Sequence, residues 1–393
     1  MSWPMVKLGD VCTINPRLPK NANPEQEVTF LAMAAVSEKG EISSQETRIL
    51  HETKKGFTYF ERGDVLLAKI TPCFENGKAT LTNNLNTQIG FGSTEFHVLR
   101  AFPDLILPEF IFYLVWNERF RIAAAKEMTG SAGQKRVSTD YLKEYKFYLP
   151  SIFEQEKIVA ALNKGYSIHR KRQQAIKLAD DFLRATFLEM FGDPIENPKG
   201  WNVKPLADQI VHANNGISRR RKEDTNEGDI VLRLQDVHYS GIAFDKELNR
   251  IKLVDKEKQI ARVEHDDLLF IRVNGNPNYV GRTAVFKSYI EPVYHNDHLI
   301  RIKLDNEYQS DFLCYLINSP FSRKLIAQQI KTSAGQHTIS QDGILKLMFY
   351  RPPIELQEKF INIKNKIESI FYRKDKHEDL FASISNKLIH SIK

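Results

Sequence analysis

The sequence has few cysteines and no long apolar run. Three cysteines in 393 residues are far apart, odd in number and outside any CxxC pair, which excludes a disulfide framework and a CxxC-based zinc site: Cys12, Cys73 and Cys314. No apolar run approaches the ~18 residues that a membrane-spanning helix requires, and the N-terminus lacks the apolar region of a signal peptide. We therefore expect free thiols, no membrane segment and a cytoplasmic protein.

The common catalytic signatures are also missing. The sequence contains no GxxxxGK phosphate loop, no HExxH, no GxSxG and no Asn/Asp-Pro-Pro-aromatic motif of adenine methyltransferases. Asp104 with Glu144-Tyr145-Lys146 is nuclease-like, because it offers two carboxylates and a lysine to a magnesium ion, but Glu-x-Lys also occurs at Glu52-Thr53-Lys54. His295 and His298 lack an evident third metal ligand, which favours structural histidines. We predict no catalytic and no metal-binding residue.

Charge is nearly balanced. The chain has 56 Lys and Arg against 49 Asp and Glu, a formal net charge of +7. This excess permits a polyanionic partner such as nucleic acid without demanding one.

An internal duplication is the most informative feature. Trp3 and Leu8-Gly9-Asp10 reappear 198 residues later as Trp201 and Leu206-Ala207-Asp208, and Gly63-Asp64-Val65-Leu66 corresponds to Asp266-Asp267-Leu268-Leu269. Ser-Ala-Gly-Gln at 131–134 recurs letter for letter at 333–336, and Gln-Glu-Lys at 155–157 recurs at 357–359. Ordered matches at nearly one offset predict two copies of one plan. Residues 13–59 and 210–262 occupy equivalent places without convincing similarity, which indicates a shared scaffold with divergent surfaces.

Each copy ends in a long helical segment. Glycine and proline are almost absent between Pro150 and Gly192, apart from Gly165, which predicts a helix of about 40 residues, roughly 60 Å long. The second copy repeats this pattern after Pro353. Alternating steps of four and three mark one apolar row on each helix, with Gln173 and Lys374 as central polar interruptions. We predict that these coiled-coil positions pair the two helices antiparallel: Val159, Leu162, Tyr166, Ile176, Leu183, Phe187, Phe360, Ile363, Ile367, Ile370, Phe381, Ile384 and Leu388. The alternative is that each amphipathic helix packs separately on its own domain.

The globular parts mix strand and helix patterns. Residues 65–70, 96–99, 268–273 and 299–302 predict strands, while residues 110–122 and 312–330 predict helices. The expected fold class is α+β, with two similar globular domains joined by two long helices. The expected boundaries are 1–150, 151–192, 193–352 and 353–393.

The repeated Ser-Ala-Gly-Gln loops are the first candidate binding site. Small residues let the backbone approach a phosphate, hydroxyl and amide groups donate to it, and glutamine pairs bidentately with adenine. A tight turn alone would not require Gln134 and Gln336, which favours binding. The candidates in these loops are Ser131, Gly133, Gln134, Lys135 and Arg136, and Ser333, Gly335, Gln336 and His337.

Two further groups carry suitable donors. One follows the paired strands and comprises Lys69, Thr71, Asn76 and Lys78 in the first copy and Arg272, Asn274, Asn276, Asn278, Tyr279 and Arg282 in the second. Ordinary hairpin turns explain such glycine- and asparagine-rich loops equally well. The other is the basic run Arg219, Arg220 and Arg221, which is either a phosphate clamp or a solvated loop.

Taken together, these motifs resemble the specificity (S) subunit of type I restriction-modification systems over essentially the full length. The resemblance rests on the Trp-x4-Leu-x-Asp openings, the 63–66 and 266–269 strands, the Ser-Ala-Gly-Gln loops and the Gln-Glu-Lys helix starts. One departure is Phe187, Phe191 and Gly192-Asp193-Pro194 after the first helix, which have no clear match near Lys393.

The resemblance implies that each globular module is a target recognition domain that reads half of a bipartite site in double-stranded DNA. It also implies that the helices seat two methyltransferase subunits, with restriction (translocase/endonuclease) subunits as further partners. S-adenosylmethionine, ATP and magnesium would then belong to partner subunits, and this chain would be non-catalytic and bind no cofactor. Two alternatives remain: a standalone DNA-modifying or DNA-cleaving enzyme with an unusual active site, and a non-DNA scaffold built on a helical hairpin.

Overall fold

The computed structural model describes residues 3–131, 133–218, 227–239, 241–244 and 247–371, together with Lys387 and Ile389. The chain divides into two compact units, residues 1–174 with 374–393 and residues 175–373, and the division falls inside one long helix. In the described residues, no helix is both long enough and apolar enough to cross a membrane.

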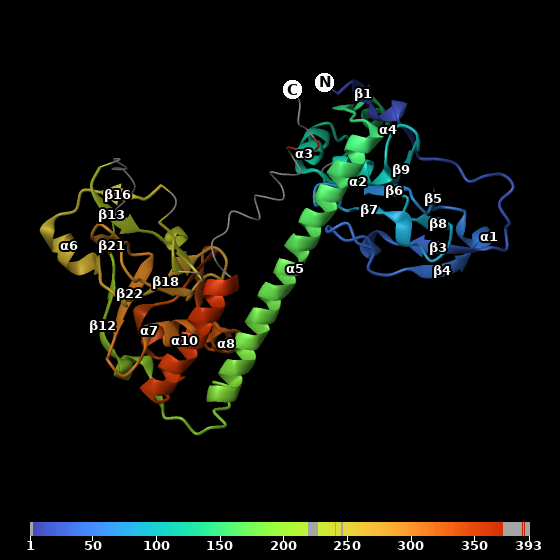
Figure 1. Ribbon diagram of the computed structural model, residues 1–393. Coiled ribbons are helices and arrows are strands. Elements are labelled where there is room, and N and C mark those ends of the chain that lie inside the picture. The colour runs from blue at the N-terminus through green and yellow to red at the C-terminus, as the bar shows by residue number, and fades with distance from the viewer. Residues whose placement is uncertain are drawn as a thin grey trace. The chain divides into compact units, whose positions relative to one another are not determined.

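Unit 1 contains two four-stranded sheets (Figure 1). The first has the order β2 (Cys12–Ile14), β9 (Phe96–Ala101), β6 (Val65–Ala68) and β7 (Ala79–Leu81), with all pairs antiparallel. The second has the order β4 (Glu46–Ile49), β3 (Glu27–Leu31), β8 (Ile89–Gly92) and β5 (Thr58–Glu61), in which β3 and β8 are parallel. β1 (Met5–Lys7) pairs with β10 (Lys146–Tyr148). The helices are α1 (Leu50–Thr53), α2 (Pro108–Trp116), α3 (Glu118–Lys126), α4 (Thr139–Glu144) and α5 (Ile152–Phe191).

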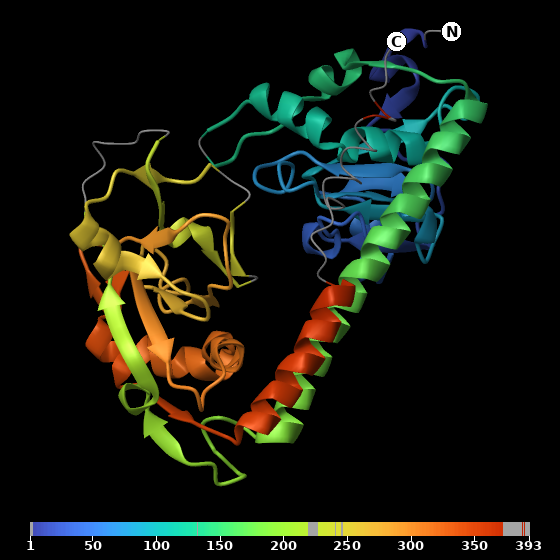
Figure 2. The same ribbon diagram turned by 60° about the vertical axis from the view of Figure 1, so that its left-hand side comes forward.

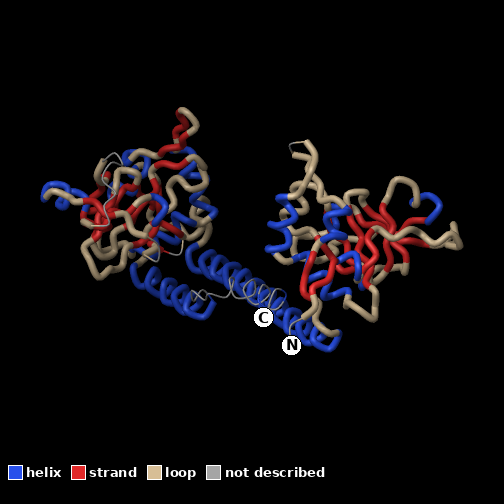
Figure 3. The backbone as a smooth tube through the Cα atoms, turned by 90° about the horizontal axis from the view of Figure 1, so that it is seen from above, coloured by secondary structure: helices blue, strands red, loops and turns tan. Residues whose placement is uncertain are grey.

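Unit 2 repeats this topology. Its first sheet has the order β12 (Ile210–Asn215), β22 (Leu299–Leu304), β18 (Leu268–Ile271) and β20 (Thr283–Val285). Its second sheet has the order β16 (Arg250–Ile251), β13 (Asp229–Leu232), β21 (Val293–His295) and β17 (Arg262–Val263), in which β13 and β21 are again the parallel pair. The smaller pairings join β11 (Val203–Pro205) to β25 (Met348–Tyr350), β14 (Val237–His238) to β15 (Gly241–Ile242), and β19 (Val273–Asn274) to β24 (Gln336–Thr338) and β23 (Lys331–Ser333). Its helices are α6 (Asp255–Ala261), α7 (Ser310–Asn318), α8 (Pro320–Gln329), α9 (Gln341–Leu345) and α10 (Ile354–Phe371). The predicted α+β class and duplication are confirmed, and Figure 3 shows the strands of each unit gathered together.

The continuous apolar runs of β6 and β18 reflect burial on both faces. Val65 and Leu67 face the core beneath the helices, whereas Leu66 faces the second sheet. Leu268 and Phe270 alternate in the same way with Leu269 and Ile271. Since successive strand side chains point to opposite faces, each strand is shared by two cores and requires apolar residues throughout.

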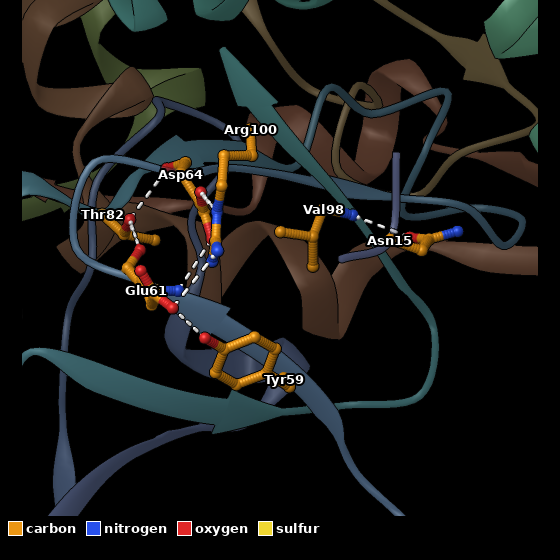
Figure 4. Close-up of polar contacts among 7 residues, drawn as sticks. All are labelled: Asn15, Tyr59, Glu61, Asp64, Thr82, Val98 and Arg100. Carbon is orange, nitrogen blue, oxygen red and sulfur yellow. Dashed lines mark hydrogen bonds and ion pairs between the residues drawn. The ribbon is translucent and has the colours of Figure 1, made fainter. Parts of the chain in front are cut away.

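A duplicated ion pair fixes the turn that leads into each of these strands. Arg100 donates to both carboxylate oxygens of Asp64, at 2.8 and 2.7 Å, and to Glu61 at 3.2 Å (Figure 4). The hydrogen bonds to Asp64 are the main reason that the pKa of Arg100 is raised. Asp64 also accepts the backbone N–H of Glu61 at 2.7 Å. In unit 2, Asp267 accepts the backbone N–H of Glu264 at 2.7 Å and lies 3.6 Å from Arg301 Nε.

The repeated Gln-Glu-Lys motif anchors each long helix. Gln155 is buried, accepts the backbone N–H of Leu107 at 2.9 Å and donates to the carbonyl groups of Leu105 and Pro150. Gln357 makes the equivalent bonds to Gln309, Glu307 and Pro352. Gln155 therefore joins the start of α5 to the segment before α2, and Gln357 joins the start of α10 to the segment before α7.

Helix α5 has clear start and stop signals. Ser151 and Glu154 form a capping box in which Ser151 N–H and O–H donate to the Glu154 carboxylate at 3.0 and 2.8 Å. Gly192, with φ of 77°, ends the helix by donating to Leu188 O at 2.8 Å.

The predicted antiparallel helix pairing is confirmed where the structure describes both partners. Within unit 2, α10 lies along the C-terminal part of α5 (Figure 2), and the rings of Phe187 and Phe191 lie 5.4 and 5.8 Å from that of Phe360. Val159 and Leu162 are buried in the core of unit 1, Leu183 is buried, and Tyr166, Ile176, Ile363 and Ile367 are half-buried. Phe381, Ile384 and Leu388 lie outside the described residues.

Ile370 corrects the predicted apolar row, because its side chain is 67% exposed. The buried face of α10 is set by Gln357, Phe360 and Ile361. At about 100° per residue, Ile370 lies far around the helix from the centre of that face. An apolar row defined by alternating steps of four and three residues therefore drifts around a straight helix, away from its packed side.

Candidate nucleic-acid interface

In unit 1 the fold brings the first two groups of predicted binding residues together. Residues 129–136 form a hairpin, closed by hydrogen bonds of 3.1 and 2.8 Å between Thr129 and Arg136. The hairpin lies against the segment that follows β6: Thr71 N–H donates to Lys135 O at 3.0 Å, and Val137 N–H donates to Lys69 O at 2.9 Å. One surface therefore combines two loops that are far apart in the sequence.

Unit 2 builds the same arrangement. Strands β23 and β24 form the hairpin, and β24 pairs with β19, which places Thr338 opposite Val273 and His337 opposite Asn274. Ile339 N–H donates to Arg272 O at 2.9 Å, as Val137 does to Lys69 in unit 1. The combined loop surface is thus part of the duplicated scaffold.

The hairpin tips present their polar groups to solvent. Exposed residues are Ser131, Gly133, Gln134 and Lys135 in unit 1 and Ser333, Gly335 and Gln336 in unit 2. Gly133 and Gly335 have φ angles of 81° and 76°, which favour glycine. His337 is half-buried, and its Nδ1 lies 2.8 Å from Thr332 Oγ1.

Arg136 differs from the other hairpin residues, because a carboxylate already neutralises its charge. Its Nε and Nη2 donate to Glu95 at 3.0 and 2.9 Å, and its Nη1 donates to Gln134 O at 3.1 Å. These hydrogen bonds are the main reason that the pKa of Glu95 is lowered. Arg136 therefore orients the backbone that carries Gln134.

The segment after Lys69 binds its own unit. Thr71 donates to Glu75 at 2.9 Å, Asn76 to Glu38 at 2.9 Å, and Lys78 to Met33 O at 3.3 Å. These contacts favour the interpretation of this segment as a structural turn.

The matching segment of unit 2 contains two successive Asx turns. Asn274 accepts the N–H of Asn276 at 2.9 Å, and Asn276 accepts the N–H of Asn278 at 3.0 Å. Arg272 Nη1 donates to Asp297 O at 3.2 Å. Asn276 and Asn278 are exposed beside the hairpin, so turn chemistry and an accessible polar surface coexist here.

Arg282 lies between two tyrosine rings at the end of this segment. Its guanidinium carbon is 3.8 Å from the ring centre of Tyr239 and 4.1 Å from that of Tyr279. Stacking on both faces fixes the plane of the guanidinium group. The predicted basic run Arg219, Arg220 and Arg221 lies outside the described residues.

The weaker catalytic and metal patterns form no site in the described residues. Glu144 pairs with Lys7 at 2.8 Å. His97 is buried, with Nε2 2.8 Å from Val137 O, and burial lowers its pKa. Burial also lowers the pKa of His295, to about 4. No group of three His, Cys, Asp or Glu side chains that could hold a metal ion occurs in that part of the chain.

Three residues near these surfaces were not predicted from the sequence: Glu95, Tyr239 and Arg323. Glu95 and Tyr239 are recognisable only by contacts across the fold. Arg323 carries a sequence signal, because Arg121 stands 202 residues earlier. Both arginines donate to carbonyl groups of the equivalent turns, Arg121 to Glu75 O and Arg323 to Val280 O.

Comparison with known proteins finds relatives of the first unit by sequence. Residues 2–178 match the family described as type I restriction modification DNA specificity domain. The type I restriction enzyme EcoAI specificity subunit of Escherichia coli is 36% identical over 173 residues, which is 44% of this chain and 29% of that protein. The EcoEI specificity subunit of Escherichia coli is 37% identical over 163 residues, 41% of this chain and 27% of that protein. The chain thus matches less than a third of the length of these relatives.

A solved structure extends the likeness of the fold to the second unit. The type I restriction-modification system S subunit from M. genitalium covers 99% of this chain and 95% of its own, with a TM-score of 0.59 at 15% identity. Residues 2–178 thus match the type I restriction modification DNA specificity domain, and the whole chain shares the fold of a solved specificity subunit.

Proposed function

We propose that this chain is the DNA-recognition subunit of a type I restriction-modification complex and reads a bipartite target, one half-site per unit. The observation that carries the proposal is the duplicated hairpin surface, which presents exposed hydroxyl and amide groups in both units. Such groups bind phosphates and base edges. The match of residues 2–178 to a DNA specificity domain supports DNA as the ligand.

The long helices complete the proposal. Helix α5, with 40 residues, extends for about 60 Å and contributes residues to the cores of both units. We propose that α5 and α10 also seat two methyltransferase subunits, to which restriction subunits are added. In this arrangement S-adenosylmethionine, ATP and magnesium are bound by the partners, and this chain supplies no catalytic group.

The decisive experiment is methylome sequencing of cells that express this chain with its methyltransferase partner. We expect modified adenines in a single two-part motif with a fixed spacer. Cells that express either protein alone should show no such methylation. Methyl transfer or DNA cleavage by the purified chain alone would instead establish a standalone enzyme.

A further inference from the structure

Unit 2 contains a cluster of two arginines and two tyrosines at the end of the asparagine-rich segment. Arg282 is stacked between Tyr239, which is 53% exposed, and Tyr279, which is 40% exposed. Both faces of the guanidinium group are covered by rings, so its N–H edges remain as the binding groups.

Arg323 of α8 lies next to this stack. Its Nη2 donates to the carbonyl groups of Pro277, Asn278 and Val280 at 3.3, 3.4 and 2.9 Å, which fixes it under the turn that carries Tyr279. Burial lowers the pKa of Arg323; Tyr239 opposes this effect, and the positive charge of Arg282 adds to it. Arg323 Nη1 also lies beside Gly281, 3.6 Å from the position that a Cβ atom would take there, so the two guanidinium groups flank the same short segment.

Both guanidinium groups retain donors without acceptors. Arg282 Nε and Arg323 Nη1 are buried and have no hydrogen-bond partner in the described part of the chain. No described carboxylate forms an ion pair with either group, whereas Arg250 and Arg351 of the same unit pair with Glu291 and Asp305. Buried donors and unpaired like charges are costly, and an anion would satisfy both.

The cluster is specific to unit 2. The residue that corresponds to Tyr279 in unit 1 is Glu75, and Lys78 replaces Arg282 and donates to Met33 O at 3.3 Å. Arg121, the counterpart of Arg323, donates to carbonyl groups at 2.6 and 3.3 Å. The shared scaffold thus requires the arginine in α3 and α8, but not the second cation or the tyrosine rings.

We propose that Arg282 and Arg323, framed by Tyr239 and Tyr279, form a phosphate-binding site that takes one phosphate of the DNA backbone. The fork of guanidinium donors matches the tetrahedral oxygens of a phosphate group. Arg282 follows β19 by a few residues, and β19 pairs with the exposed hairpin. A DNA strand bound by the hairpin can therefore place one of its phosphates at this site. The identity of the phosphate as DNA rests on the proposed function.

The first test is a salt titration of DNA binding by the full chain in complex with its methyltransferase partner. Arg282→Gln should reduce the magnitude of the negative slope of log K against log salt by ~0.9, the value for one lost phosphate contact. Arg282→Gln with Arg323→Gln should lower it by about the same amount, because both residues bind one phosphate. Lys324→Gln is the matched control, since it removes an exposed charge one residue from Arg323 and should leave the slope almost unchanged.

The second test uses inorganic phosphate with the full chain, compared with chloride at equal ionic strength. Phosphate should raise the thermal unfolding temperature of the parent and of Lys324→Gln, but not of Arg282→Gln. Circular dichroism before heating checks that each variant is folded. Arg282 Nε has no hydrogen-bond partner in the described residues, so we expect Arg282→Gln to fold normally.

Each combination of results is decisive. A lowered DNA slope in Arg282→Gln with phosphate stabilisation retained would overturn phosphate as the group that Arg282 binds. Loss of both effects in Arg282→Gln supports the proposal. Phosphate stabilisation that requires Arg282, together with an unchanged DNA slope, would overturn the assignment to DNA and indicate a free phosphate ligand. Parent-like behaviour of Arg282→Gln in both tests would overturn the site itself. Failure of the proposed function appears separately, as the absence of a methylation motif with the parent chain.

Discussion

Two pairs of glutamines are duplicated in the chain, and burial separates their roles. Gln155 and Gln357 are buried and use their amide groups within the fold. Gln134 and Gln336 are exposed at the hairpin tips. The sequence marks both pairs equally, but only the second pair is available to a ligand.

At the hairpin tip of unit 1, base contacts and phosphate contacts should separate by mutation. Gln134→Ala should cost about 1–3 kcal/mol of cognate binding and relax specificity at one position. Lys135→Ala should weaken specific and non-specific binding alike and lower the salt slope by ~0.9. Salt titrations on cognate and scrambled DNA measure both effects. If both variants bind like the parent, the hairpin is only a turn.

Glu95 should restrain non-specific binding, because it neutralises Arg136. Glu95→Gln frees that guanidinium group for a phosphate contact. The negative slope of log K against log salt on scrambled DNA should therefore become steeper by ~0.9. The same substitution combined with Arg136→Gln should return the slope to the parent value. A steeper slope that persists in the double variant would show that loss of the carboxylate charge, and not release of Arg136, is responsible.

His295 should make the stability of unit 2 depend on pH. Burial lowers its pKa to about 4, below the ordinary value near 6.5. Between these values the unfolded chain binds the proton and the folded chain does not, so stability falls as pH drops from about 6.5 towards 4, by up to about 3 kcal/mol. Urea unfolding across this range measures the loss, and His295→Gln should flatten it. An equally steep loss in His295→Gln would assign the effect to carboxylates.

Among the elements, the long helix α5 contributes to the cores of both units. Val159 and Leu162 face the core of unit 1, whereas Phe187 and Phe191 belong to the core of unit 2. Leu183 is 4% exposed, but Leu178, five residues earlier, is 68% exposed. In this part of α5, one side of the helix is therefore buried and the opposite side is exposed.

This contrast gives a matched pair of variants. Leu183→Asp places an unpaired charge in a buried position and should destabilise unit 2 by about 3–5 kcal/mol. Leu178→Asp should change stability by less than about 0.5 kcal/mol, because the side chain is exposed. Thermal unfolding of the full chain compares them. Equal effects would show that Leu183 is not packed as described.

For the whole molecule, the important property is that two units share one topology with different surfaces. Both have the same order of four strands in each of two sheets and the same parallel pair. The segments 13–59 and 210–262, which lack sequence similarity, nevertheless form equivalent strands. Backbone pairing and two-sided burial can be met by many apolar sequences, so the scaffold persists where the letters do not.

Module exchange tests the division of labour under the proposed function. Residues 1–150 transplanted into a related chain should change one half of its methylation motif and leave the other half intact, because each unit has its own hairpin surface. Methylome sequencing of the chimera with its methyltransferase reads both halves together. A motif changed in both halves would contradict independent reading.

The sequence by itself determined the duplication, the α+β class, the limits of α5 and the strands β6 and β18. These features depend on local signals: a capping serine, a terminal glycine, and the apolar residues needed for burial on two faces. Only the tertiary structure decided which polar groups remain available. Arg136 donates to Glu95, which is 41 residues away in the sequence. Arg282 stacks on the ring of Tyr239, which belongs to another hairpin. Whether a charge is neutralised, stacked or free depends on such distant partners, and their positions follow from the fold and not from the neighbouring sequence.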